Sequence, residues 1–163
     1  MKRGCILLAL LAGCPAAKTA PDAGPVDAGP AQLTEQEPND RPEDALSLTD
    51  SAVVSAQLET NPSKPDEDWY LLAPSSPRTV DLTVSGIPGA DVALDVYDVD
   101  RNRLLTLNSE GIGKPERLPN LGVKSRLYLK VYSARKGAGG AYTLSALFRE
   151  PVPGFEWEPN DRA

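Results

Sequence analysis

Residues 127–132 read LYLKVY, an alternation in which Leu127, Leu129 and Val131 are apolar and the residues between them carry a polar group. Successive side chains of a β-strand point to opposite faces, so this pattern places one side of the strand against a core and the other toward water. A helix would not separate these residues into two faces at a spacing of two. The stretch therefore predicts a half-buried β-strand.

The same alternation recurs along the chain. It is present in residues 80–84 (VDLTV), 92–96 (VALDV) and 142–148 (YTLSALF). Further candidate strands are residues 53–58, 69–72 and 104–107, and turn-forming stretches such as GIPGAD and DVDRNR separate the candidates. No segment of ten or more residues shows a helical period. The pattern predicts an all-β fold of about seven strands, arranged as a single antiparallel, jelly-roll-like β-sandwich.

Length and composition limit the chain to one domain and exclude several functions. With 163 residues, 40% of them hydrophobic and 6% aromatic, it can bury one modest core. It contains no histidine, which removes imidazole-based catalysis and the usual ligand sets of catalytic zinc. Its formal net charge of −6 repels a phosphate backbone, so no nucleic acid is expected as a partner. We expect no enzyme activity in this chain.

The first fourteen residues, MKRGCILLALLAGC, have the arrangement of an export signal. A basic start precedes an apolar run that is too short to span a bilayer but long enough for the core of a signal peptide. The segment resembles a bacterial lipoprotein signal, whose lipobox here would be Leu11, Ala12, Gly13 and Cys14. The resemblance implies cleavage after residue 13 and lipidation of Cys14, which anchors the chain to a membrane. The alternatives are an ordinary secretory signal cleaved elsewhere and an N-terminal membrane anchor.

Two consequences follow from the lipoprotein signal. Cleavage removes Cys5, so no internal disulfide is expected in the exported chain. Pro15 follows the lipidated cysteine, and it is not the aspartate that retains some lipoproteins at the inner membrane. We therefore expect an exported, membrane-anchored lipoprotein at the outer membrane.

Composition divides the chain into four parts. Residues 1–13 are the lipoprotein signal peptide, and residues 14–33, rich in Pro, Ala, Gly and Asp, are predicted to be a disordered tether. Residues 34–150 hold the predicted sandwich. Residues 151–163 are a linker followed by EWEPNDR, which repeats the heptad EQEPNDR of residues 35–41 at six of seven positions. Because the spacing is that of a whole domain, we interpret the heptad as a domain's opening and residues 151–163 as the start of a truncated second repeat.

Several motifs together resemble a known family. They are the opening EPND (residues 37–40), the stretch DEDWY (residues 66–70), the run around Asp91, Leu94 and Val96, and the closing GAYTL (residues 140–144). Their order and spacing resemble the bacterial pre-peptidase C-terminal domain, a family similar to the collagen-binding domains of bacterial collagenases. The resemblance implies a β-sandwich of the kind attached to secreted proteases and other exported proteins.

Acidic residues at the front of the domain form a candidate calcium site. In an extended backbone Glu35, Glu37 and Asn39 point the same way, and Pro38 disfavours a helical conformation at the residue before it. Ca²⁺ takes six to eight oxygen ligands, which carboxylates and an amide can supply. In the family, a segment of this pattern binds calcium together with aspartates from a later loop. The resemblance thus implies a site made by Glu35, Glu37, Asn39, Asp40, Asp66 and Asp68.

The same residues have a simpler interpretation. The EPNDRPEDA stretch can be a solvated turn in which Asn39 and Asp40 bond their own backbone, and residues 66–68 can be a polar loop before a buried Trp69. Both interpretations remain open from the sequence.

Three tyrosines form a candidate ligand surface. Tyr128 and Tyr132 share the outward face of one predicted strand, and Tyr97 lies on the outward side of another. The collagen-binding relatives use surface aromatic residues to hold their ligand, and such rings suit an extended protein or polysaccharide. The alternative is that these rings pack against neighbouring strands and bind nothing.

These features predict a lipid-anchored, calcium-stabilised binding or accessory module of the cell envelope. Two alternatives remain: the chain is the front of a larger secreted hydrolase or protease whose catalytic domain lies outside it, or it is a structural spacer in an array of like domains. The oligomeric state is not indicated by the sequence.

Overall fold

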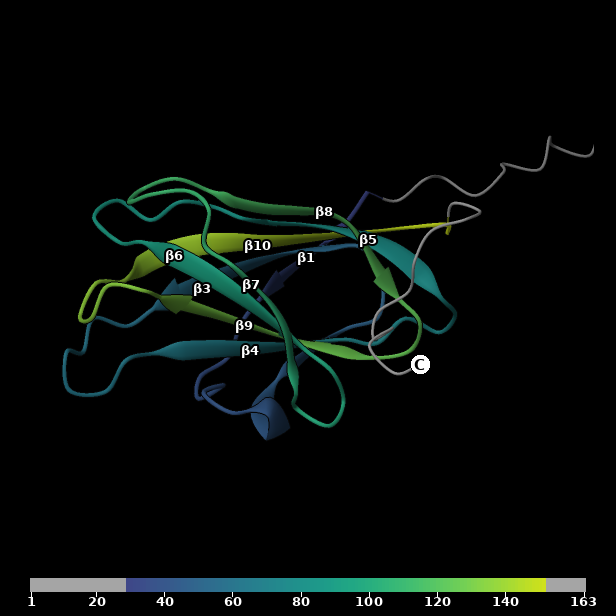
Figure 1. Ribbon diagram of the computed structural model, residues 1–163, viewed down its shortest axis with the longest axis horizontal. Coiled ribbons are helices and arrows are strands. Elements are labelled where there is room, and N and C mark those ends of the chain that lie inside the picture. Colours follow the sequence, from purple (N-terminus) through teal and green to yellow (C-terminus); the bar gives the residue numbers. More distant parts are fainter. Residues whose placement is uncertain (1–28, 152–163) are drawn as a thin grey trace, which may run out of the picture.

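The structure, a computed structural model, describes residues 29–151 of the chain (Figure 1). The predicted signal peptide, Cys14 and the second heptad lie outside these residues. The strands are β1 (Ala31–Thr34), β2 (Leu46–Leu48), β3 (Ala52–Leu58), β4 (Glu67–Leu72), β5 (Arg78–Val84), β6 (Val92–Tyr97), β7 (Arg103–Leu107), β8 (Glu116–Val123), β9 (Leu127–Ser133) and β10 (Gly140–Arg149). A single-turn 3-10 helix, η1 (Pro42–Asp44), lies between β1 and β2.

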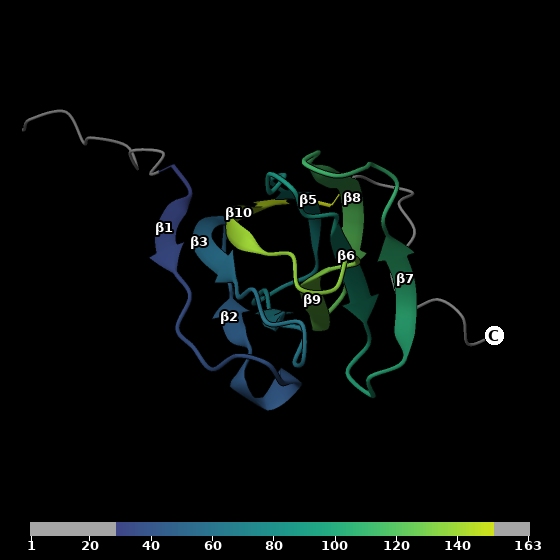
Figure 2. The same cartoon turned by 90° about the vertical axis from the view of Figure 1, so that its left-hand side faces the viewer.

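The strands form two five-stranded sheets. The first has the order β1-β3-β10-β5-β8 and the second the order β2-β4-β9-β6-β7. The two sheets face each other, as the end-on view in Figure 2 shows. A layer of buried side chains lies between them. The predicted all-β sandwich is confirmed.

Two strand pairs depart from the predicted antiparallel arrangement. β1 runs parallel to β3 and β2 runs parallel to β4, while the other pairs are antiparallel. Both parallel strands are edge strands, and both belong to the N-terminal part of the domain. The first strand begins at Ala31, three residues before the predicted start of the domain. The N-terminal part of the domain thus adds one outer strand to each sheet.

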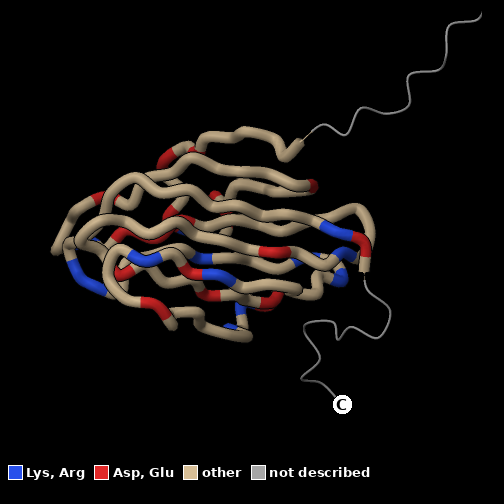
Figure 3. The backbone as a smooth tube through the Cα atoms, turned by 90° about the horizontal axis from the view of Figure 1, so that it is seen from above, with Lys and Arg blue, Asp and Glu red and all other residues tan. Residues whose placement is uncertain are grey.

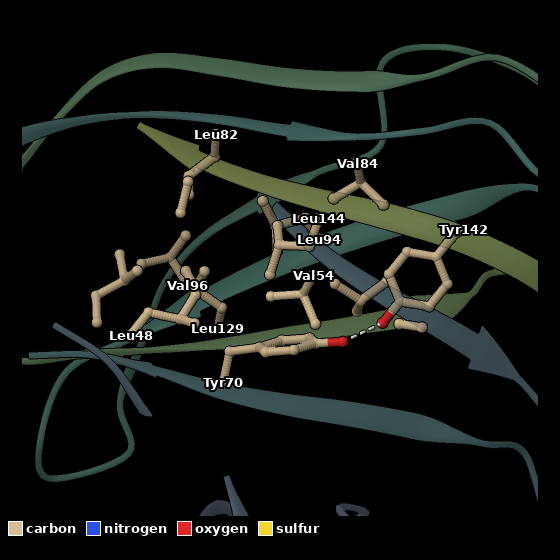
Figure 4. Close-up of a cluster of buried hydrophobic side chains, with 14 of the residues drawn as sticks. Leu48, Val54, Tyr70, Leu82, Val84, Leu94, Val96, Leu129, Tyr142 and Leu144 are labelled. Carbon is tan, nitrogen blue, oxygen red and sulfur yellow. Dashed lines mark hydrogen bonds between the residues drawn. The ribbon is translucent and has the colours of Figure 1, made fainter. Parts of the chain in front are cut away.

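The core lies between the sheets and follows the alternation seen in the sequence. Leu127, Leu129 and Val131 are fully buried, as predicted from the LYLKVY stretch. Figure 4 shows how side chains from both sheets, among them Leu144 of β10 and Leu129 of β9, meet in this layer. Burying one such aliphatic side chain contributes about 1.5–3 kcal/mol, so the core is the main source of stability.

A connecting segment, defined here as residues 35–45, leads from β1 in the first sheet to β2 in the second. It lies against the edge of β4, where the backbone N–H of Trp69 donates to the carbonyl oxygen of Asn39 at 3.1 Å. Further along, Glu43 in η1 pairs with Arg101 in the β6–β7 turn. The connecting segment is therefore fixed to the second sheet at two separate points.

Within residues 29–151 no helix is long and apolar enough to cross a membrane. Lysine and arginine positions lie among the acidic ones rather than in one block (Figure 3).

Candidate metal centre

Three of the predicted carboxylates come together at one end of the sandwich. Glu35 follows β1, Glu37 lies two residues further on in the connecting segment, and Asp68 lies in β4. One oxygen from each lies within 4.8 Å of the others. Glu35 is fixed by β3, because the backbone N–H of Gln57 donates to its Oε1 at 2.6 Å. The side chains reach one another because the connecting segment passes from one sheet to the other at this end.

Asn39 joins this group, as the spacing of the heptad predicted. Its side chain is only 1% exposed, and its Nδ2 donates to Oε2 of Glu35 at 3.3 Å. Its backbone N–H donates to Oε2 of Glu37 at 3.1 Å. The two glutamates and the asparagine thus form one contiguous set of oxygen-bearing groups.

Asp40 and Asp66 form a second part of the acidic region, beside the first. Oδ2 of Asp40 accepts from Nζ of Lys64 at 2.7 Å, and this bond lowers the pKa of Asp40. Oδ2 of Asp66 accepts from the backbone N–H of Glu59 at 2.5 Å. Burial raises the pKa of Asp66, and the nearby carboxylate of Asp40 raises it further. All six predicted ligand residues therefore lie at this end of the fold, in two adjoining groups.

Two buried oxygens of the acidic region have no hydrogen-bond partner among the described residues. They are Oδ1 of Asn39 and Oδ1 of Asp68, and the latter residue is fully buried. A buried acceptor without a partner is unfavourable by about 1–3 kcal/mol. A bound cation would satisfy such oxygens, so their presence favours a metal site over a solvated turn.

Burial makes the charged form of these acids unfavourable in the absence of a cation. The pKa of Asp68 is raised to about 8, mainly by desolvation and in addition by the charges of Glu35, Asp66 and Glu37, although the hydrogen bond with Tyr142 acts to lower it. Desolvation also raises the pKa of Glu37, with added repulsion from Asp66 and Glu35. A divalent cation would lower these pKa values by favouring the ionised carboxylates.

Two tyrosines that the sequence did not identify as site residues join the acidic group to the core. The hydroxyl of Tyr70 in β4 donates to Oε2 of Glu35 at 2.9 Å, and that of Tyr142 in β10 donates to Oδ2 of Asp68 at 2.6 Å. The two hydroxyl oxygens lie 2.7 Å apart (Figure 4). A continuous chain of polar groups therefore runs from Glu35 through Tyr70 and Tyr142 to Asp68.

The hydrogen bonds among these four residues limit the protonation states that they can have together. Three oxygen–oxygen contacts need three hydrogens, but the two tyrosines supply only two. If both carboxyls are ionised, the hydroxyls donate to Asp68 and Glu35, and none is left for the contact between Tyr70 and Tyr142. A proton on Asp68 supplies the missing hydrogen, which agrees with the raised pKa of that residue. In this protonated form Asp68 donates to Tyr142, Tyr142 donates to Tyr70, and Tyr70 donates to Glu35.

The available donors suit a hard cation. The six residues offer carboxylate and amide oxygens, which are the ligands that Ca²⁺ prefers, and the whole chain contains no histidine. If Ca²⁺ binds, Glu35, Glu37, Asn39 and Asp68 would hold it, and Asp40 and Asp66 would add charge beside it. The ion would supply positive charge to acids that otherwise repel one another.

The predicted tyrosine surface lies on the outer face of the second sheet. Tyr97 in β6 is directly opposite Tyr128 in β9, and Tyr132 lies four residues further along β9. The ring of Trp69 in β4 packs 5.1 Å from that of Tyr97 and 6.4 Å from that of Tyr128, measured between centroids. All three tyrosines are half-buried, so they share one face and also pack against neighbouring strands.

A lysine lies at the centre of this aromatic cluster, and no pattern in the sequence indicated it. Nζ of Lys130 lies 4.7 Å from the ring centroid of Tyr132 and 5.9 Å from those of Trp69 and Tyr97. It also pairs with Glu67 at 3.1 Å. The rings of Trp69, Tyr97 and Tyr132 therefore already interact with the ammonium group of Lys130.

Comparison with known proteins finds similarity among solved structures. No known family profile matches the sequence, and no curated protein sequence matches it. Among solved structures, the chain is similar to the pre-peptidase C-terminal domain of collagenase from Bacillus anthracis, with 22% sequence identity, a TM-score of 0.49, and coverage of 66% of this chain and 99% of that one. It is also similar to PliG of Aeromonas hydrophila, a periplasmic inhibitor of g-type lysozyme, with 14% identity, a TM-score of 0.44, and coverage of 74% of this chain and 98% of that one.

The first of these similarities agrees with the sequence motifs. That solved structure is a pre-peptidase C-terminal domain, the kind of domain that the motifs resemble. The likeness concerns the fold, and the candidate site is defined by the residues of this chain.

Proposed function

We propose that the chain is an exported, lipid-anchored β-sandwich without catalytic activity of its own, stabilised by Ca²⁺. Its role is to hold an extracellular protein or polysaccharide close to the cell envelope, as a binding or accessory module. One observation carries the calcium part of this proposal: three carboxylates converge within 4.8 Å beside buried oxygens of Asn39 and Asp68 that lack partners.

Calcium would act on stability rather than on a reaction. Since a ligand that binds only the folded state stabilises it, an ion at 100 times its dissociation constant contributes about 2.7 kcal/mol. For an exported chain without an internal disulfide, such a contribution is a large part of the total stability. The connecting segment would gain most, because it carries four of the six candidate ligands.

Thermal unfolding tests the calcium site. Residues 15–163, which include every strand of both sheets, are unfolded with a chelator and with Ca²⁺ in the millimolar range. We expect Tm to rise by several degrees with Ca²⁺, and the Glu35→Gln, Glu37→Gln double variant to lose most of this rise. Equal midpoints with and without Ca²⁺ in the unaltered chain would exclude the site.

The lipid anchor rests on the lipobox ending at Cys14. Palmitate labelling of the full chain in a bacterial host tests it. We expect label in the unaltered chain and none in the Cys14→Ala variant, which should also leave the membrane fraction. Label that persists in the variant would exclude Cys14 as the anchor.

The ligand surface is proposed for the outer face of the second sheet, because Tyr97, Tyr128 and Tyr132 share that face. Cosedimentation with purified cell-wall polysaccharide, and separately with envelope proteins, tests it. Tyr132→Ala should weaken binding at least tenfold. Thr143→Ala, an exposed residue of β10 in the other sheet, should leave binding unchanged. Equal binding by both variants would exclude this face.

A spacer in an array of like domains is the second candidate function. The repeated heptad at residues 156–162 favours it. A spacer requires no ligand, so binding to either polymer through the tyrosine face would count against it.

A further inference from the structure

The loop between β3 and β4 places one lysine among the acids of the candidate metal centre. Lys64 lies in this loop, and its Nζ is 2.7 Å from Oδ2 of Asp40 in the connecting segment. The lysine side chain is 70% exposed and the aspartate side chain 25% exposed. The contact therefore ties a surface lysine to a carboxylate that belongs to the acidic region.

The loop holds Lys64 in this position through its backbone. Oδ1 of Asn61 accepts from the backbone N–H of Ser63 at 3.0 Å and from that of Lys64 at 3.2 Å. Such an asparagine-centred turn fixes the direction of the residues that follow it. The ammonium group is thus presented to the acidic region by local structure.

The ammonium group lies in a surface hollow that is otherwise acidic. The hollow, about 280 Å³ in volume, is lined by Glu37, Pro38, Asp40, Glu59, Asn61, Lys64 and Asp66. Among these lining residues Lys64 is the one base, against four acids. Its hydrogen bond with Asp40 raises its pKa, and the charges of Asp66 and Glu37 act in the same direction. The lysine therefore interacts with several carboxylates, including a candidate ligand of the metal.

We infer that Lys64 is a built-in counter-ion of this hollow, whose ammonium takes the place beside Asp40 and Asp66 that a free cation would otherwise occupy. The chain then binds Ca²⁺ more weakly than its carboxylates alone would allow. This inference rests on the proposed calcium site and adds to it a residue that sets the affinity. Its physical basis is repulsion between a fixed unit charge and a nearby divalent ion, together with the carboxylate that the lysine occupies.

Calorimetric titration of residues 15–163 with Ca²⁺ tests the inference in three variants. Lys64→Met removes the charge and keeps much of the side-chain volume, while Lys64→Arg keeps the charge. Lys124→Met is the matched control, because it removes the same charge from an exposed position close to Leu127, which pairs with the far end of β4. We expect Lys64→Met to bind Ca²⁺ about tenfold more tightly than the unaltered chain, or to bind an additional ion. The other two should stay within twofold.

Unfolding of the same variants adds a readout that a merely structural lysine would not give. In chelator, Lys64→Met should have a lower Tm than the unaltered chain, because Asp40 and Asp66 lose their counter-ion. In saturating Ca²⁺ the order should reverse. A lysine that only stabilises the loop would lower Tm in both conditions, and that result would overturn the inference.

The outcomes separate this inference from the proposed function. If the unaltered chain binds Ca²⁺ and Lys64→Met binds it equally or more weakly, the inference is wrong and the calcium site stands. If only Lys64→Met binds Ca²⁺, the inference is supported and the calcium part of the proposed function is wrong for the natural chain. If neither binds Ca²⁺, both are wrong.

Discussion

The hydroxyl oxygens of Tyr70 and Tyr142 lie 2.7 Å apart and come from opposite sheets of the sandwich. Each hydroxyl also contacts a carboxyl group, Glu35 on one side and Asp68 on the other. The pair therefore links the interior of the fold to the candidate metal centre. Substitution or titration of the acids should therefore change the free energy of unfolding.

Removal of one hydroxyl from this pair should destabilise the domain. Tyr142→Phe keeps the ring in the core but leaves Oδ2 of Asp68 without its hydrogen-bond partner. We expect a loss of about 1–3 kcal/mol in the free energy of unfolding, measured by urea denaturation in chelator. Tyr128→Phe, on the half-buried outer face, is the control and should change stability by less than about 0.5 kcal/mol. Equal stability of the two variants would contradict the role given to the tyrosine pair.

The stability of the ion-free chain should fall as pH rises. The folded state raises the pKa of Asp68 from 3.8 to about 8, so it holds this proton more tightly than the unfolded chain does. The resulting stabilisation is complete below the unfolded pKa and is lost as pH rises through the folded one, by at most about 1.4 kcal/mol per pH unit. Urea denaturation in chelator between pH 5 and 8 should show this fall. In saturating Ca²⁺ it should be smaller or absent, and a rise in chelator would contradict the assignment.

Asp68→Asn separates the electrostatic effect from the hydrogen bond. The amide can still form a hydrogen bond with Tyr142, but no buried charge remains. We therefore expect the variant to be more stable than the unaltered chain in chelator at pH 8, and to lose the rise in Tm with Ca²⁺. Differential scanning calorimetry in both conditions measures this. A variant that is less stable in chelator and still responds to Ca²⁺ would show that Asp68 is not a ligand.

Lys130 should be a structural residue of the outer face. Its ammonium contacts Glu67 and lies 3.7 Å from Oδ2 of Asp95, whose side chain is 1% exposed. Lys130→Ala leaves Glu67 and Asp95 without this cation and removes the contact with Tyr132, so we expect a loss of about 1–3 kcal/mol in unfolding free energy. Lys136→Ala, in an exposed loop, should have little effect in the same denaturation experiment. Similar losses in both would show that the aromatic cluster does not hold the lysine.

The alternation of residues predicted most of the fold but missed three strands. β1 and β2 have four and three residues, too few for a period of two to be distinguished. β8 reads ERLPNLGV, and Pro119 and Asn120, the latter with φ of 58°, interrupt its alternation. All three are edge strands, where one side of the backbone needs no partner and the sequence is less constrained.

The acidic residues of the candidate site were predicted from the sequence, but the residues that contact them were not. The heptad and the DEDWY stretch carry oxygen donors at regular spacing, so their residues were recognisable. β4 is buried at Asp68, Trp69 and Tyr70 in succession, because the other sheet covers its inner face and the rings of Tyr97 and Tyr128 pack against Trp69 on its outer face. A period of two does not predict burial on both faces. Contacts such as that between Tyr70 and Tyr142 depend on which strands meet, and the sequence did not indicate that.

The two chain ends of the domain and the candidate metal centre lie at opposite ends of β3. Ala31 and Ala146 are both aligned with Ala52, so the chain enters the first sheet and leaves it near the same end of β3. Glu35 accepts from Gln57 close to the other end, about 20 Å away for a strand of this length. In the proposed anchored form, the domain would be attached to the membrane at the end where β1 begins. The opposite end, which carries the candidate metal centre, would then face the surrounding medium and the divalent ions in it.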